Sequence, residues 1–316
     1  MVAAGRTVWL CPGQGAQKVG MGKDLADRFP EARATFAAID DALGFGLSRL
    51  MFEGPEDELT ATHNAQPAIL AHSAAVHAVV APKTGATVAA AAGHSLGEYS
   101  AYVTAGALAA PHAATLVRRR GELMHKAGEQ RPGMMAAILG LATAEVEAAC
   151  HEVSGKGAVA VAANLNAPDQ TVISGDPDAV ARAGAACKAR GAKRVMPLRV
   201  SGAFHSPLMA PAASHLRLVV DHAEFAEPHF PVLANATAEA VTTAARARRL
   251  LVDQLTAPVR WIECMQHAAR LAGEGVRFLE IGPGGALAGL AKRILPGATA
   301  VSLGTADELA QFLEAA

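Results

Sequence analysis

Short apolar runs that end in glycine turns and precede longer helical patterns recur along the chain. They lie at Thr7–Cys11, Thr87–Ala92 and Val276–Ile281, and each has the length of a strand. The first two runs are continuously apolar after a leading threonine, and the third is mostly apolar, so both faces of these strands are expected to be covered. Buried strands that feed helices are typical of a parallel sheet, and the pattern predicts an α/β fold class.

The segment between about Gly133 and Leu198 has a different pattern. Its expected elements are a strand, a helix, two strands, a helix and a strand, at 134–139, 143–152, 158–164, 170–174, 177–189 and 193–198. This βαββαβ order matches the ferredoxin-like plan, with a turn at 166–169 joining the middle strands. We therefore expect an inserted small domain at 131–199 and a discontinuous large domain formed by 1–130 and 200–316.

Composition and charge narrow the class of protein. The chain has 316 residues, of which 51% are hydrophobic, enough for a sizeable core. Its 28 basic and 29 acidic residues leave no general positive field for nucleic acid or an anionic membrane, so a charged partner must meet a local patch. The most apolar segment, 67–81, is shorter than the ~20 residues of a membrane span. Four dispersed cysteines and the absence of a signal-peptide core predict a cytoplasmic protein with reduced thiols.

The clearest chemical motif is Gly93-His94-Ser95-Leu96-Gly97. It follows the expected strand at 87–92 and precedes a helical stretch at 98–108, which is the context of a nucleophile elbow. Small residues at 93 and 97 allow the tight turn, which exposes the serine hydroxyl beside free amide groups at the helix start. Ser95 is therefore a candidate nucleophile, with an ordinary turn serine as the alternative.

A serine nucleophile needs a base, and twelve histidines are available. No H-E-x-x-H or Cys/His spacing indicates a zinc site, and no metal is expected. His205 lies in a loop after the last small-domain strand and before a helix that Pro207 opens, where loop residues often face a cleft. Its position alone leaves open whether it is catalytic. The histidines expected to be packed or solvated in helical patterns are His72, His77, His215, His222 and His267.

Two further motifs stay ambiguous on local grounds. The glycines around Gln14 would let main-chain amides approach a ligand, but Lys18 stands where a dinucleotide fingerprint needs glycine. A polar turn residue is the simpler interpretation of Gln14. Arg118, Arg119 and Arg120 follow one another on a helix, where successive side chains point about 100° apart. Nothing local distinguishes Arg120 from a solvated arginine.

Taken together in this order, five motifs resemble the malonyl-CoA:acyl carrier protein transacylase family. They are Gly13–Gln17, Gly93–Glu98, Arg120-Gly121, Ser201–Met209, and Gln254 with Pro258–Trp261, and the resemblance extends from about residue 8 to residue 294. It implies an α/β-hydrolase-like large domain with a ferredoxin-like insert, in agreement with the strand order. It also implies transfer of malonyl from malonyl-CoA to the phosphopantetheine thiol of an acyl carrier protein in fatty-acid synthesis, by a monomer without a permanently bound cofactor.

The resemblance further implies catalytic roles for single residues. Ser95 would be the nucleophile and His205 its general base. Gln254 would orient the imidazole through its main-chain carbonyl, so that no triad acid is needed. The main-chain amides of Gln14 and Leu96 would form the oxyanion hole.

Substrate and partner residues follow from the same resemblance and from charge. Arg120 would bind the free malonyl carboxylate, because a planar guanidinium can hold a carboxylate bidentately. Phe204 matches malonyl-selective relatives, in which its bulk would close space beside the acyl Cα. Asn166 matches a position near the acyl-donor cleft, with a turn asparagine as the alternative. The charge pattern adds a basic cluster that either docks an acidic carrier protein or is a solvated face, namely Lys188, Arg190, Lys193 and Arg194.

Three rival functions remain at the level of sequence. An acyl hydrolase would share the nucleophile and base but deliver water to the acyl-enzyme. A catalytically silent carrier-binding protein would be expected to have lost Ser95 or His205, and both are present. A free-standing acyltransferase that serves a polyketide synthase has the same motifs, and the sequence does not separate it from an enzyme of fatty-acid synthesis.

Overall fold

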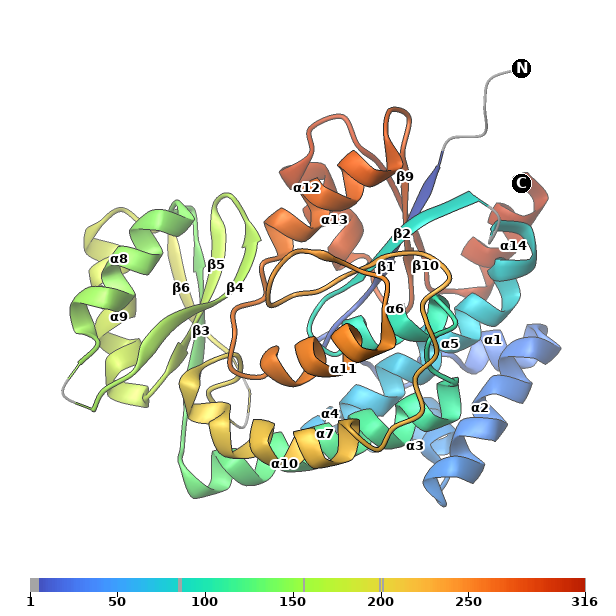
Figure 1. Ribbon diagram of the computed structural model, residues 1–316, viewed down its shortest axis with the longest axis horizontal. Helices are drawn as coiled ribbons and strands as arrows, with labels where there is room; N and C mark the ends of the chain where they lie inside the picture. Colours follow the sequence, from blue (N-terminus) through green and yellow to red (C-terminus); the bar gives the residue numbers. More distant parts are fainter. Residues whose placement is uncertain (1–5, 85–86, 156, 199, 201, 316) are drawn as a thin grey trace.

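The chain folds around two separate sheets, which Figure 1 shows side by side. The computed structural model describes residues 6–84, 87–155, 157–198, 200 and 202–315. Ser201, the first residue of the motif that contains His205, lies outside the described residues. The larger sheet has the order β10 (Thr299–Leu303), β9 (Arg277–Ile281), β1 (Thr7–Cys11), β2 (Val88–Gly93), β7 (Val232–Leu233) and β8 (Ala240–Val241).

The larger sheet is parallel except at one edge, where β8 runs antiparallel to β7. Every residue of β1 is buried, which accounts for its unbroken apolar sequence. Because strand side chains alternate, Trp9 and Cys11 contribute to the main core on one face, while Val8 and Leu10 belong to a second cluster on the other. The three strands predicted from apolar runs thus form the centre of this sheet.

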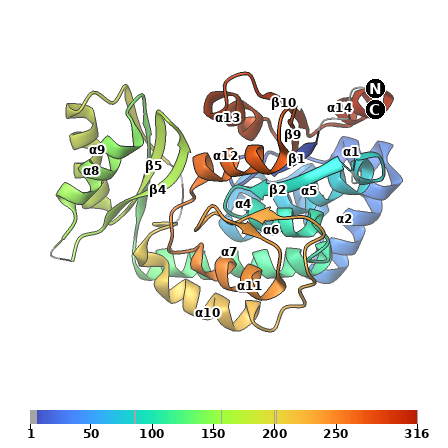
Figure 2. The ribbon, with the colours of Figure 1, turned by 45° about the horizontal axis from the view of Figure 1, so that its top comes forward.

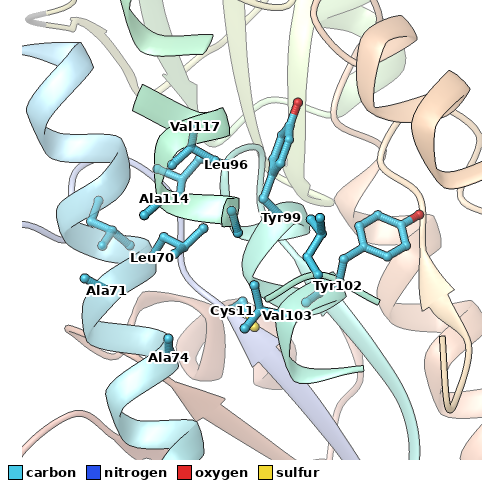
Figure 3. Close-up of a cluster of buried hydrophobic side chains, with 14 of the residues drawn as sticks. Cys11, Leu70, Ala71, Ala74, Leu96, Tyr99, Tyr102, Val103, Ala114 and Val117 are labelled. Carbon is cyan, nitrogen blue, oxygen red and sulfur yellow. The ribbon is translucent and has the colours of Figure 1, made fainter. Parts of the chain in front are cut away.

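Helices cover both faces of the larger sheet (Figure 2). The main core lies against α5, α6 and α7, and Figure 3 shows Cys11 of β1 among Leu70, Val103 and Val117 from these three helices. No helix in the described ranges has both the length and the apolarity needed to cross a membrane. The helices outside the smaller sheet are α1 (Lys23–Arg28), α2 (Pro30–Leu43), α3 (Leu47–Glu53), α4 (Glu56–Thr60), α5 (Thr62–Thr84), α6 (Gly97–Thr104), α7 (Ala110–Gln130), the 3-10 helix η2 (Pro207–Met209), α10 (Ala210–Val220), α11 (Ala244–Asp253), α12 (Trp261–Ala272), α13 (Ala286–Ile294) and α14 (Ala306–Ala315).

The smaller sheet is antiparallel and has the βαββαβ chain order expected from the sequence. Two helices pack against it and bury a small core of their own. The predicted α/β class with a ferredoxin-like insert is confirmed, whereas the division of the chain at residues 130 and 200 stays a prediction. The elements in chain order are β3 (Met134–Leu139), α8 (Thr143–Val153), β4 (Ala160–Ala167), β5 (Gln170–Gly175), α9 (Pro177–Ala189) and β6 (Arg194–Pro197).

β4 differs from its predicted extent and connects the two sheets. It continues to Ala167, three residues beyond the expected end, because two register shifts against β5 accommodate the extra length. Its edge then pairs with the loop between α11 and α12. The amide of Leu165 donates to the carbonyl of Val259 at 2.9 Å, and the amide of Val259 donates to the carbonyl of Ala163 at 2.8 Å. The small sheet is therefore joined to the large one by main-chain hydrogen bonds.

Candidate active site

Ser95 lies at the sharp turn between β2 and α6 and has a left-handed backbone, with φ of 54°. Such a conformation costs a non-glycine residue about 1–3 kcal/mol and needs support from its surroundings. A Cβ on Gly93 would lie 1.8 Å from the carbonyl oxygen of Gly97, so the turn requires glycine there. Asn235 supplies the support, because its Oδ1 accepts from the Ser95 amide and its Nδ2 donates to the Gly93 carbonyl, both at 2.7 Å.

His205 meets Ser95 across the site. Its Nε2 lies 2.8 Å from Ser95 Oγ, and its Nδ1 lies 3.0 Å from the main-chain carbonyl oxygen of Gln254. A carbonyl only accepts hydrogen bonds, so Nδ1 carries the proton and Nε2 is free to accept the serine proton. Burial, and secondly the charge of Arg120, lower the pKa of His205 to about 3. The imidazole is therefore a neutral base at physiological pH.

Arg120 is the member of the arginine triplet that is buried, with 1% of its surface exposed. Its Nη1 donates to Gln66 Oε1 at 2.7 Å, and its Nη2 donates to Gln254 Oε1 at 2.9 Å and to Ser95 Oγ at 3.2 Å. All three partners are neutral, and no carboxylate of the described residues forms an ion pair with it. Burial lowers the pKa of Arg120, and the charge of Glu98, which makes no direct contact with it, acts in the opposite direction. A buried cation that no carboxylate touches is costly, so the position beside Ser95 favours an anionic ligand.

The amides of Gln14 and Leu96 are the predicted oxyanion hole. Leu96 precedes the first residue of α6, where helix amides lack intrahelical acceptors. Neither amide donates to another described residue, and the Gln14 side chain donates to Thr62 Oγ1 at 3.5 Å. Both amides are thus available to an incoming oxygen, and their role stays a prediction.

Asn166 lies in β4, and the alternative of a turn asparagine is wrong. Its Oδ1 lies 2.8 Å from Nε2 of His94, the residue before the nucleophile, and 8% of Asn166 is exposed. The strand extends further than the sequence pattern indicates, which carries this side chain into the interior. Phe204 is also buried and belongs to the main core.

The predicted basic cluster lies on the small domain, where all four side chains are exposed. Arg190 is not a free cation, because it forms ion pairs at 2.9 Å with both Glu145 and Glu152. The Lys188 ammonium donates to the main-chain carbonyl of Lys193 at 2.8 Å. Lys193 and Arg194 have no acidic partner within the described part of the chain. The free positive charge of this cluster is smaller than its sequence indicates.

The sequence alone does not identify Gln66 or Asn235, which help to hold the site together. It places Glu98 in a motif but assigns it no role. Gln66 and Asn235 are single polar residues in helical or loop segments, and no motif marks them. Within the described residues no group of three His, Cys, Asp or Glu side chains could hold a metal ion. The four cysteines are buried and unpaired.

Comparison with known proteins identifies relatives along almost the whole chain. The acyl transferase domain family matches residues 8–308. The chain is 44% identical over 290 residues to the malonyl CoA-acyl carrier protein transacylase of Bacillus subtilis, covering 92% of this chain and 90% of the relative. It is 43% identical over 307 residues to the enzyme of the same name from Escherichia coli, covering 97% and 98%.

Solved structures agree with these relatives. The malonyl-CoA:acyl carrier protein transacylase of Xanthomonas oryzae pv. oryzae has a TM-score of 0.93 and 40% identity, with 98% of each chain covered. A malonyl-transacylase solved in complex with its type II polyketide synthase acyl carrier protein has a TM-score of 0.92 and 43% identity, covering 98% of this chain and all of that one.

Proposed function

The chain belongs to the malonyl-CoA:acyl carrier protein transacylase family, and we propose that it performs this transfer through Ser95 with His205 as its base. The relatives of the same name favour transfer of malonyl from malonyl-CoA to an acyl carrier protein, and we place this transfer in fatty-acid synthesis. One observation carries the residue assignment: Ser95 Oγ lies 2.8 Å from the neutral imidazole and 3.2 Å from a buried guanidinium that no carboxylate contacts directly. This arrangement supports a nucleophile that reacts beside a carboxylate.

The first half-reaction forms a malonyl ester. Ser95 Oγ attacks the thioester carbonyl carbon of malonyl-CoA while Nε2 of His205 takes the hydroxyl proton. The amides of Gln14 and Leu96 would donate to the oxyanion of the tetrahedral intermediate. When the carbon–sulfur bond breaks, His205 returns the proton to the departing coenzyme A thiolate. His205 Nδ1 stays bonded to the Gln254 carbonyl throughout, which stabilises the transient imidazolium.

The second half-reaction repeats these steps in reverse with the phosphopantetheine thiol of the carrier protein. His205 removes the thiol proton, the thiolate attacks the ester carbonyl, and Ser95 leaves with the proton. The two substrates therefore react in turn at one site, with ping-pong kinetics. The chemistry needs no resident cofactor, because malonyl-CoA enters as a substrate and the carrier protein brings its own prosthetic group. We also propose that the protein acts as a monomer, and that it acts in the cytoplasm, where its four unpaired thiols would stay reduced.

Arg120 is the proposed malonyl ligand. The guanidinium already fixes the Ser95 hydroxyl and is held by two amide oxygens, so its orientation is set before substrate binds. Its Nε is buried without a hydrogen-bond acceptor among the described residues, and its Cζ lies 5.7 Å from the centroid of the Tyr99 ring. We assign Phe204 to the wall beside the acyl Cα and Asn166, through His94, to the acyl-donor side of the cleft. Lys188, Lys193 and Arg194, with Arg190 held in ion pairs, are the proposed contact for an acidic carrier.

A polyketide pathway is the alternative that an observation supports, because a solved relative at 43% identity is bound to a type II polyketide synthase carrier. The isolated malonyl-enzyme tests both pathway and reaction. Discharge should be fast with one holo carrier protein from a panel that contains fatty-acid and polyketide carriers, and slow in buffer. Loss of the malonyl group to water at a rate equal to that with every carrier would instead indicate an acyl hydrolase.

A further inference from the structure

We infer that Glu98 is a positioning residue, whose carboxylate holds the side chain of Gln254 where it supports Arg120. The inference rests on the proposed function of Arg120 and assigns a further residue to the same site. Glu98 directly follows the G-x-S-x-G motif on the first turn of α6 and is fully buried. A carboxylate with no exposed surface at this position needs an explanation, because burial of such a group is costly unless its hydrogen bonds are satisfied.

The hydrogen bonds of Glu98 run to two separate elements. Its Oε2 accepts from Nε2 of Gln254 at 2.7 Å and from the main-chain amide of Asn235 at 2.9 Å. Its Oε1 has no partner in the described part of the chain. One oxygen atom thus joins the end of α11 to the loop after β7. Burial raises the pKa of Glu98 to about 7, and a proton on Oε1 would leave both bonds to Oε2 intact.

The Gln254 amide transmits this contact to the selectivity residue. Its Nε2 donates to Glu98 and to the Ser95 carbonyl, at 2.7 and 3.0 Å, which leaves Oε1 facing Arg120 Nη2 at 2.9 Å. If the amide rotated, its nitrogen would face the guanidinium, and two donors would meet. The Glu98 oxygen, together with the Ser95 carbonyl, therefore fixes which end of the Gln254 amide faces Arg120.

A second arm reaches the nucleophile. Glu98 accepts from the amide of Asn235, and the side chain of Asn235 bonds both to Ser95 and to the Gly93 carbonyl. This arm supports acylation by any donor, because it holds the strained turn of Ser95 and not Arg120. We call the contacts of Glu98 with Gln254 and Asn235 the brace. Loss of the brace should therefore slow acylation in general but slow malonyl transfer more than acetyl transfer. A residue that served stability alone would lower both rates by one factor.

Two substitutions at Glu98 separate the effect of side-chain length from the effect of negative charge. Glu98→Asp keeps the charge but withdraws the carboxylate by one carbon–carbon bond, beyond hydrogen-bond reach of Gln254. Glu98→Gln keeps the reach and an acceptor oxygen but removes the charge. Rates of acyl-enzyme formation with malonyl-CoA and acetyl-CoA are measured by rapid quench and intact mass. The ratio of the two rates should fall about tenfold or more in Glu98→Asp and stay within about threefold of the parent in Glu98→Gln.

Glu280 offers a matched control. It is a second fully buried glutamate, in β9, whose Oε2 accepts from the Ala288 amide at 2.8 Å and whose Oε1 is unpartnered among described residues. Glu280→Asp should lower the unfolding midpoint and leave the malonyl:acetyl ratio unchanged. An unchanged ratio in Glu98→Asp, or equal losses in Glu98→Asp and Glu98→Gln, would overturn the inference.

A second route does not depend on Glu98→Asp being stable. Gln254→Met removes the amide but keeps the main-chain carbonyl that His205 needs, and it should lose the same ratio. The double variant Glu98→Asp with Gln254→Met should lower the malonyl:acetyl ratio no further than Gln254→Met alone, because both substitutions interrupt the same series of contacts to Arg120. Full additivity would contradict the brace. Arg120→Ala separates this inference from the proposed function. If Arg120→Ala keeps the malonyl:acetyl ratio of the parent, the proposed role of Arg120 is wrong. If Arg120→Ala lowers the ratio but Glu98→Asp does not, only the role of Glu98 is wrong.

Discussion

The main-chain carbonyl oxygen of Gln254 lies 3.0 Å from Nδ1 of His205, in the place where many serine enzymes have a carboxylate. The carbonyl fixes the imidazole tautomer without adding a negative charge. The side chain of the same residue bonds to Arg120 at 2.9 Å. The proposed base and the proposed carboxylate ligand are therefore positioned by two different groups of one residue.

Replacement of the proposed nucleophile should abolish covalent loading. Brief incubation with malonyl-CoA should add one malonyl mass to the parent protein and none to Ser95→Ala, because no other hydroxyl is bonded to His205 in the described structure. Intact-mass spectrometry makes the measurement. Ser100→Ala, which alters a buried serine within α6, is the control and should load normally. Loading of Ser95→Ala at the parent rate would show that the nucleophile is misassigned.

Truncation of Arg120 should be costly for malonyl and not for acetyl. In Arg120→Ala, kcat/KM for malonyl-CoA should fall by about 2–5 kcal/mol of transition-state stabilisation, as expected when one partner of a buried charged pair is removed. Acetyl-CoA, which has no carboxylate, should be accepted as well as before or better. Arg120→Lys should recover part of the malonyl activity, since an ammonium keeps the charge but not the paired planar contact.

Arg118→Ala is the matched control for Arg120. Arg118 lies half a turn away on α7, is partly exposed and pairs with Glu122 at 3.2 Å. Its truncation should leave the donor preference unchanged. Equal, small effects of the two substitutions on malonyl transfer would show that Arg120 does not bind the malonyl carboxylate.

The rate of acylation should not fall near pH 6.5, where protonation of an ordinary histidine would remove the base. His205 has its pKa lowered from 6.5 to about 3, so the neutral base is present at all pH values well above 3. The rate of malonyl-serine formation, measured by rapid quench, should stay nearly level from pH 7 to 5. In Arg120→Ala the repulsion by the guanidinium is lost, so the pKa of His205 should rise and the acidic limb should move to higher pH. A parent limb centred near 6.5 would contradict the assignment.

Phe204→Ser should relax selectivity against an α-methyl branch. Exclusion of one methyl group is worth about 1–3 kcal/mol, so the kcat/KM ratio of methylmalonyl-CoA to malonyl-CoA should rise without full inversion. The ring is buried in the main core, so the substitution should also cost stability, about 3–5 kcal/mol by analogy with Phe→Ala. Both donors are therefore measured on the same preparation, well below its unfolding temperature. An unchanged ratio would place the pocket wall elsewhere.

Carrier docking should depend on the free cations of the small domain. The double reversal Lys193→Glu with Arg194→Glu should raise the carrier KM, and added salt should raise the parent KM, because exposed charges are screened over ~8 Å at physiological ionic strength. Acylation by malonyl-CoA should change little. Arg190→Ala is the comparison, since that side chain is held by Glu145 and Glu152 and should matter less. A carrier KM that the double reversal leaves unchanged would exclude this surface.

Elements with strong local patterns could be predicted from the sequence. The strands at Thr7–Cys11 and Met134–Leu139 and the helix at Pro177–Ala189 have the predicted bounds. Each combines an unbroken apolar run or helical periodicity with a proline or glycine at its boundary. The strands Val232–Leu233 and Ala240–Val241 have two residues each, too few to show any periodicity, and only pairing to β2 and to each other defines them.

The site shows the same limit. Ser95 is marked by its strand–turn–helix context, but Arg118, Arg119 and Arg120 look alike until tertiary packing buries the last of them. Asn235 bonds to Ser95 across 140 residues of sequence and Gln254 to Glu98 across 156. Contacts this remote leave no local signal, so the residues that support the nucleophile become visible only in the folded chain.

The pairing of β4 with the segment at Val259 affects the design of chimaeras in which the small domain is exchanged between related enzymes. A chimaera that takes only residues 131–199 from a relative would set a foreign strand edge against a native partner, because Val259 bonds to Ala163 and Leu165. Val259 also packs in one cluster with Ala167 and Trp261, so side-chain fit at this seam involves both sheets. A graft intended to transfer carrier preference should therefore include residues 257–259, which lie about 60 residues beyond the insert in sequence but adjoin it in space.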